Sequence, residues 1–274
     1  METIVKPGSR KGRVLSALRE LWTYRELAIV LIDRDIRVRY KQTFVGIAWA
    51  FVQPFMTMVV FTLFFGKIAK IPTGDVPYHL FSFAGILPWQ YFARSMTEGS
   101  TALLNNAGIL TKVYFPREVL PVSTVIAGLV DFAIGMVFLF VLMALEGYYP
   151  TFNALWSIPL MMLASFLALS FSFWVSSAAA IYRDIGFIIP FFVQLLMFAT
   201  PVIYPASIVP DKYQFLYSLN PMVVVIEGMR WSLLGMGDAP SLLHLSVSAG
   251  VVGLLLITGV SYFNKAVRQV ADKI

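Results

Sequence analysis

The sequence contains no cysteine and only two histidines, His79 and His244. Without cysteine there is no disulfide framework and no cysteine metal cluster, and no metal site is predicted. A phosphate-binding GxxxxGK[ST] motif is also missing, because Gly66-Lys67 is followed by Ile68 and no glycine precedes at the required spacing. HExxH and GxSxG are absent too. The chain is therefore predicted not to be an enzyme and to hold no cofactor of its own.

Charged residues are equally scarce. They make up 13% of the 274 residues, whereas 58% are hydrophobic, and the mean hydropathy is +0.76. A soluble domain of this length would carry far more charge. The N-terminal region has no apolar core followed by a small-residue cleavage site, so no cleaved signal peptide is predicted. These features predict a polytopic membrane protein.

The apolar segments predict an all-α fold. A helix that crosses a bilayer needs about 20 mostly apolar residues. Six segments are predicted to cross: 44–66, 78–104, 119–145, 154–181, 185–204 and 243–263. The second turns polar in its second half, and Pro88 is expected to kink it. The chain then divides into a cytoplasmic N-terminal segment (1–43), a transmembrane domain (44–264) and a cytoplasmic tail (265–274).

The distribution of lysine and arginine predicts the orientation. With six spans, 16 of the 21 Lys and Arg residues lie on the face that holds both termini, and four lie on the other. Because basic residues stay in the cytoplasm, both termini are predicted to be cytoplasmic. The segment before residue 44 accounts for most of the net charge of +6. The basic pI therefore needs no nucleic-acid partner.

The segment before the first predicted span has two parts. Residues 14–31 sort into an apolar and a polar face at helical spacing, which predicts an amphipathic helix. It either lies in the cytoplasmic interface of the membrane or packs on a soluble partner. Next, four cations and Tyr40 crowd around a single acid, Asp35. This basic rim either only fixes the topology or binds an anion such as a phosphate: Arg34, Arg37, Arg39 and Lys41.

Polar residues inside the predicted spans are few. Arg94 and Glu98 are four residues apart, so they can pair on one helix face. Asp131 is expected to face a neighbouring helix or a cavity. Between the fifth and sixth spans, prolines interrupt the sequence repeatedly, and the run 222–234 is too short to cross. We expect short re-entrant or interfacial helices there on the external side, with a structured loop as the alternative.

Several segments together resemble one family. Residues 21–66 (LWTYRELAIVLIDRDIRVRYKQTFVGIAWAFVQPFMTMVVFTLFFG) are similar to the N-terminal signature of type-2 ABC exporter permeases that move lipid-linked polysaccharides. The runs at 86–123, 178–191, 200–205 and 219–231 resemble the same family, in the expected order. Its members include the O-antigen, capsule and teichoic-acid exporters.

The resemblance implies a homodimer in the bacterial cytoplasmic (inner) membrane. Two copies of a separate ATPase subunit would bind ATP and magnesium, which fits the missing P-loop. The resemblance also implies a cytoplasmic gate at the basic rim and external re-entrant helices that close the channel. The residues that would contact the ATPase are Asn105, Asn106, Phe115, Pro116, Arg117, Glu118, Tyr182, Arg183 and Asp184. The residues of the external gate would be Tyr204, Asn220, Pro221, Glu227 and Arg230.

A mechanism follows as a hypothesis. The basic rim would capture the pyrophosphate of a polyprenyl-linked glycan, most closely an O-antigen, and the sugar chain would pass between two protomers. Aromatic faces would let the sugars slide, and the candidates are Tyr40, Trp49, Tyr91 and Trp174. The alternatives are a permease of the same fold for a drug or small lipid, an intramembrane glycosyl- or acyltransferase, and a passive channel or secondary transporter. The enzyme would need buried acids or a histidine in the membrane, which this sequence hardly offers.

Overall fold

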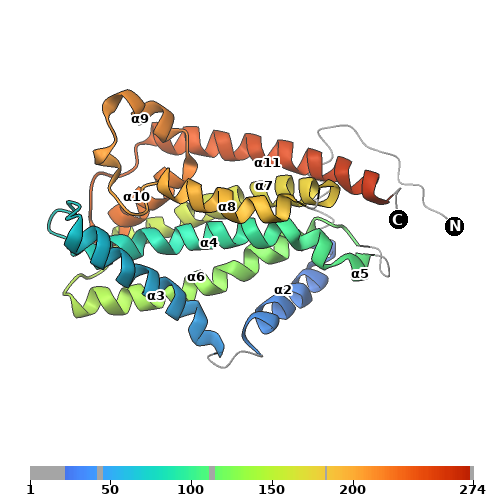
Figure 1. Ribbon diagram of the computed structural model, residues 1–274, viewed down its shortest axis with the longest axis horizontal. Helices are drawn as coiled ribbons and strands as arrows, with labels where there is room; N and C mark the ends of the chain where they lie inside the picture. Colours follow the sequence, from blue (N-terminus) through green and yellow to red (C-terminus); the bar gives the residue numbers. More distant parts are fainter. Residues whose placement is uncertain (1–21, 42–45, 111–114, 183, 272–274) are drawn as a thin grey trace.

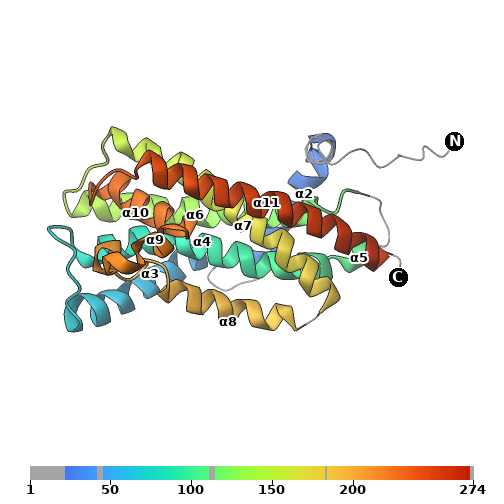
Figure 2. The same cartoon turned by 90° about the horizontal axis from the view of Figure 1, so that it is seen from above.

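The computed structural model describes residues 22–41, 46–110, 115–182 and 184–271. About 82% of the described residues are helical and none of them forms a strand, which confirms the all-α prediction. The helices are α2 (Arg25–Tyr40), α3 (Trp49–Phe61), α4 (Tyr78–Asn105), α5 (Ala107–Leu110), α6 (Val119–Leu145), α7 (Ser157–Ile181), α8 (Ile185–Phe198), α9 (Asp211–Ser218), α10 (Pro221–Leu234) and α11 (Leu242–Ala271). Figures 1 and 2 show α4, α6, α7, α8 and α11 side by side along the long axis.

Four helical stretches are long and apolar enough to cross a membrane. They are 49–68, 119–145, 152–181 and 242–267. The first joins α3 to a π-helical segment, Thr62–Ile68, and the third joins a short 3-10 turn, Phe152–Trp156, to α7. Helix α8 is apolar but has 14 residues and ends at Phe198, short of the predicted 204. The six-span count stays a prediction, because α4 is not apolar enough and α8 is too short to meet the criteria.

Helix α4 is the central helix of the bundle. Of its 28 residues, 19 are buried, and it contacts α3, α6, α7, α8 and α10. Small residues let its neighbours approach closely: a Cβ at Gly99 would lie 2.2 Å from Ser172 Oγ of α7. Ser172 Oγ donates to the carbonyl of Ser95 (3.0 Å). Because protein rather than lipid surrounds α4, it does not need the hydropathy of a lipid-facing span.

The N-terminal part differs from the sequence prediction. The end of the predicted interface helix (25–31) and the basic rim as far as Arg39 form one continuous helix, α2, because no glycine or proline occurs between residues 25 and 40. Residues 14–21 lie outside the described residues. Leu31 is buried in a second core with Phe115, Phe173 and Phe263. Helix α2 packs on α6, and Figure 1 shows it running obliquely below the bundle.

Short helices lie between α8 and α11, as predicted. Helix α10 begins where Asn220 Oδ1 accepts a hydrogen bond from the Met222 N–H (3.0 Å), with Pro221 at the first position. It ends at Gly235, which adopts the left-handed conformation (φ 68°) that glycine favours. Figure 1 places α9 and α10 at the end of the bundle opposite the termini. Their depth relative to a membrane stays a prediction.

Candidate functional site

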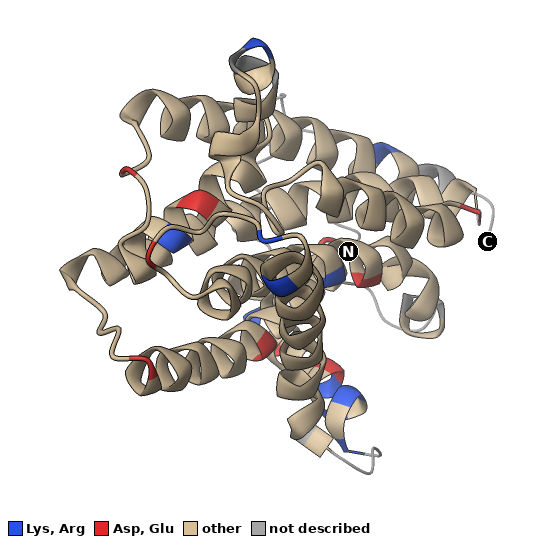
Figure 3. Cartoon of the chain, turned by 60° about the vertical axis from the view of Figure 1, so that its left-hand side comes forward, with Lys and Arg blue, Asp and Glu red and all other residues tan. Residues whose placement is uncertain are grey.

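A groove of about 510 Å³ lies between α3, α4 and α6, with Met197 of α8 at its edge. Helix α3 and helix α4 contribute most of the lining, and α6 adds Gly128, Asp131 and Phe132. The polar side chains that line it are Gln53, Thr57, Gln90, Arg94, Thr97, Glu98 and Asp131. The whole bundle carries few charged residues (Figure 3). This concentration of amides, hydroxyls and charges in an otherwise apolar bundle makes the groove the candidate site.

Of the predicted pore aromatics, Trp49 and Tyr91 line this groove and Trp174 does not. Trp49 is 50% exposed, so its ring face is available to a ligand. Tyr91 is buried, and its hydroxyl donates to Ser165 Oγ (2.8 Å), so it mainly joins α4 to α7. Trp174 stacks on Tyr262 of α11 with ring centroids 5.0 Å apart. The sequence could not separate these positions, because apolar residues flank all three of them.

Two hydrogen bonds join the walls of the groove. Gln90 Nε2 donates to Thr57 Oγ1 (3.3 Å), and Arg94 Nη2 donates to Gln53 Oε1 (3.3 Å). Sequence reasoning missed these two glutamines. Their position was the available signal, because burying an amide inside an apolar span costs free energy unless the amide faces a partner or a cavity.

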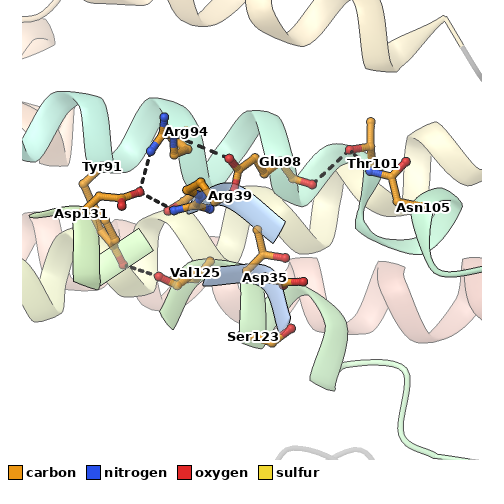
Figure 4. A network of polar contacts seen from close by, with 12 residues as sticks. Asp35, Arg39, Tyr91, Arg94, Glu98, Thr101, Asn105, Ser123, Val125 and Asp131 are labelled. Atoms are coloured by element: carbon orange, nitrogen blue, oxygen red, sulfur yellow. Dashed lines mark hydrogen bonds and ion pairs between the residues drawn. The ribbon is translucent and has the colours of Figure 1, made fainter. Parts of the chain in front are cut away.

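The inner end of the groove holds a charge network of Arg39, Arg94, Glu98 and Asp131 (Figure 4). Arg39 donates to Asp131 and to Glu98 Oε2 (2.6 Å). Arg94 donates to Asp131 Oδ2 (2.5 Å) and lies 3.6 Å from Glu98 Oε1. The predicted pairing of Arg94 with Glu98 and the predicted contact of Asp131 with a neighbouring helix are confirmed. The network joins α2, α4 and α6, and its two cations and two anions cancel.

Two other members of the basic rim, Arg34 and Arg37, are paired as well. Arg34 bonds to Asp35 Oδ1 (2.7 Å) and donates to Asn106 Oδ1 (2.7 Å). Arg37 bonds to Asp33 Oδ2 (2.6 Å). The premise of a rim around a single acid is therefore wrong, because Asp33, Glu98 and Asp131 also reach it.

Exposure separates the members of the rim. The Arg37 side chain is 64% exposed, and that of Arg39 is 15% exposed. Lys41 is exposed, whereas Tyr40, at the end of α2, is half-buried. A role in holding a substrate headgroup stays a prediction for all of them. Arg37 and Lys41 are the two that face outward.

The segments predicted to contact an ATPase are partly used inside the chain. Phe115 is buried in the second core, and Arg117 Nη1 donates to the carbonyl of Val267 in α11 (3.2 Å). Asn106 is buried and accepts the bond from Arg34. Pro116 and Glu118 are half-buried beside the start of α6. The exposed members are Asn105, Tyr182 and Asp184, and Arg183 lies outside the described residues.

Arg230, a predicted external-gate residue that is 1% exposed, contacts two of the others, Tyr204 and Glu227. Its guanidinium bonds to Glu227 Oε1 (2.9 Å) and stacks 3.6 Å from the Phe81 ring centroid. It also donates to three backbone carbonyls, those of Phe81 (3.2 Å), Val202 (2.8 Å) and Tyr204 (3.5 Å). This outer clamp fastens the irregular segment after α8 to α4.

Two further residues extend the outer clamp. Asn220 Nδ2 donates to Thr200 Oγ1 (3.1 Å). Burial raises the pKa of Tyr217 well above its ordinary value, so this phenol stays protonated near the Tyr204 hydroxyl (3.4 Å). Tyr217 was not among the predicted gate residues. The role of the predicted residues as an external gate stays a prediction.

The helices and the groove define a multi-pass membrane protein with a polar route along its central helix. The chain belongs to the ABC-2 type transporter family, whose family model matches residues 26–234. It is 30% identical over 263 residues to the O-antigen export system permease protein RfbA of Myxococcus xanthus, covering 95% of this chain and 100% of that protein.

More distant relatives transport polysaccharides as well, by their names. The RfbA protein of Klebsiella pneumoniae, an O-antigen export system permease, is 26% identical over 251 residues, which cover 90% of this chain and 94% of that protein. The polysialic acid transport protein KpsM of Escherichia coli is 22% identical over 205 residues, covering 73% and 78%. The chain is therefore a permease-type subunit of a polysaccharide export transporter.

Proposed function

We propose that this chain is the transmembrane subunit of an ATP-driven exporter that moves a polyprenyl-pyrophosphate-linked polysaccharide, most closely an O-antigen, across the bacterial inner membrane. The observation that carries the proposal is the groove along α4. It combines one exposed indole, Trp49, with amide and hydroxyl groups at the depth of the apolar helices. Such a lining suits a chain of sugars that must slide, because stacking and single hydrogen bonds hold it without trapping it.

The working unit in this proposal is a homodimer with two ATPase subunits and with both termini in the cytoplasm. Membership of the family supports an ATPase partner. Helix α8 carries an exposed aromatic face, with Phe187 83% and Phe191 63% exposed, which a second copy would cover. Asn105, Tyr182 and Asp184 are the exposed residues that would meet the ATPase.

The pyrophosphate is assigned to the outward side of α2. The pair of Arg37 with Asp33 is exposed on both sides, so breaking it costs little, about 0–1 kcal/mol. Lys41 is exposed and lies one turn further along, at the end of α2. Arg39 is excluded from this role, because a headgroup would have to displace two carboxylates from a largely buried guanidinium.

The test is transport by purified components. The chain would be reconstituted in proteoliposomes with its ATPase, and a lipid-linked O-antigen would be supplied on the ATPase side. We expect ATP-dependent appearance of glycan on the opposite side, detected with a lectin. Movement without ATP, or movement of the lipid carrier alone at the same rate, would contradict the proposal. A hydrolysis-deficient ATPase gives the control.

A further inference from the structure

We propose that the groove is a binding site for uncharged sugar units and selects against acidic polysaccharides, with Glu98 and Arg94 as the residues that set this preference. This inference rests on the proposed function, and it names the class of substrate that the groove would bind. It starts from the groove's charges, because the cations beside it are already bound to carboxylates of this chain.

The lining supplies what an uncharged sugar needs. Trp49 offers an aromatic face, on which the apolar face of a pyranose ring can stack. Gln53 and Thr57 line the α3 wall, and Gln90 and Thr97 line the α4 wall. Amides and hydroxyls both donate and accept hydrogen bonds, so they can exchange partners with sugar hydroxyls. The hydrogen bonds from Gln90 to Thr57 and from Arg94 to Gln53 are long, at 3.3 Å, and at least one partner in each is uncharged.

The same lining does not suit a carboxylate. Arg39 and Arg94 share Asp131, and Arg39 also bonds to Glu98. Asp131 Oδ1 is buried and accepts no hydrogen bond from any described residue, so the network already contains an unpaired anionic acceptor. An acidic sugar would therefore lose its hydration without gaining a free cation.

Glu98 adds a repulsive element. Its side chain is 39% exposed and lines the groove, so an anionic sugar would approach a like charge. Selection by an unfavourable contact with the wrong ligand is a general route to specificity. Replacing Glu98 by glutamine would leave the network with one net positive charge and weaken the preference.

The experiment uses the full chain in nanodiscs and follows tryptophan fluorescence. Maltohexaose is the neutral probe and hexagalacturonate is the acidic probe of equal length. We expect saturable quenching by maltohexaose and roughly tenfold weaker binding of hexagalacturonate. Trp49→Phe should remove the signal, which assigns it to the groove. Glu98→Gln should raise affinity for the acidic probe about fivefold or more and change the neutral one by less than about twofold.

Two variants make the outcome decisive. Arg94→Gln removes a positive charge, the opposite change, and should weaken binding of the acidic probe further. Asp238→Asn removes an exposed acid far from this groove and should change neither affinity. Size-exclusion elution would select the variants that remain folded. Equal binding of both probes by the unmodified protein, or no change of preference in either Glu98→Gln or Arg94→Gln, would overturn the inference.

The failure of this inference can be told apart from the failure of the proposed function. ATP-dependent export of a neutral lipid-linked glycan, without any quenching of Trp49, would overturn the groove as the sugar site and leave the function standing. Quenching with the expected preference, but no export, would overturn the function and support the groove as a sugar site.

Discussion

The two groups of buried charges differ in what their arginines bind. At the outer clamp, Arg230 is 1% exposed and bonds to one carboxylate, three backbone carbonyls and the face of Phe81. At the inner network, Arg39 and Arg94 are 15% and 32% exposed, and their hydrogen bonds shown in Figure 4 go to the side chains of Glu98 and Asp131. Backbone carbonyls are fixed by the fold, whereas side chains can change partners.

This difference separates a structural contact from one that can rearrange. The outer clamp holds the segment 202–204 on α4 and has no route by which its arginine could exchange partners without unfolding. The inner network spans three helices, and one of them, α2, is tied to the loop after α4 by the bond of Arg34 with Asn106. Movement of that loop would therefore be passed to the inner network through α2.

The largest effect is expected from Arg230→Gln. It leaves Glu227 without its cation and three carbonyls without their donor, so we expect a loss of stability of about 3–5 kcal/mol. Thermal unfolding in detergent, followed by fluorescence, measures it. Lys212→Gln removes an exposed cation on the same side and should unfold like the unmodified protein. If Arg230→Gln unfolded at nearly the same midpoint as the unmodified protein, the outer clamp would not be a structural contact.

The next effect tests the outer clamp without changing a charge. A Cβ at Gly85 would lie 2.7 Å from Arg230 Nη2 and 3.2 Å from the Val202 carbonyl. We expect Gly85→Ala to destabilise the protein by about 1–3 kcal/mol, because the guanidinium has to shift. Gly250→Ala in α11 meets nothing within 4 Å and is the matched control. The same unfolding measurement applies, and equal midpoints for the two variants would show that the clamp tolerates displacement.

Asp131→Asn is expected to affect stability less than Arg230→Gln, by about 1–3 kcal/mol, because Glu98 remains as a partner for both arginines. Export should fall by more than the loss of stability alone would cause, since the groove gains a net positive charge. Proteoliposome export and unfolding are measured on the same preparation. A loss of stability as large as that of Arg230→Gln would mean that the inner network is structural too.

The link between Arg34 and Asn106 calls for a double-mutant cycle. Changing each residue to alanine, singly and together, should give a coupling energy of about 0.5–1.5 kcal/mol, the usual range for one hydrogen bond. ATPase stimulation by the permease should fall in both single variants. A coupling energy near zero would separate α2 from the loop and contradict transmission through this bond.

The smallest effect on stability is expected at the exposed pair. Arg37→Gln and Asp33→Asn break the same ion pair, so both should change stability by less than about 1 kcal/mol. Only Arg37→Gln should lower export, because it removes the cation assigned to the pyrophosphate. Equal export by the two variants would withdraw that assignment.

Local signals in the sequence predicted what lies close along the chain. The pairing of Arg94 with Glu98 depends on a neighbour four residues away, and the short helix in the run 222–234 was expected from the prolines that interrupt this segment. Hydropathy predicted the helical class and most spans. It also described Trp49 and Trp174 in the same way, although one faces the groove and the other stacks on α11. Which side of an apolar helix meets protein depends on tertiary packing.

The basic rim shows the same limit. Its positive charge could be counted, but the partners of Arg39 lie 59 and 92 residues away. No pattern within 34–43 indicated that Glu98 and Asp131 would neutralise this positive charge. The boundary at residue 31 was also misplaced, because an amphipathic pattern can fade while the helix continues wherever no residue breaks it.

The burial of α4 has a consequence for how the chain is made. This helix carries Arg94 and Glu98 and does not qualify as a span by hydropathy. Three of its polar partners, Asp131, Ser165 and Ser172, come later in the sequence. When α4 leaves the ribosome, lipid would offer these groups nothing. The predicted entry of α4 into the bilayer would therefore be a joint event with α6 and α7, and its timing would depend on translation reaching residue 172.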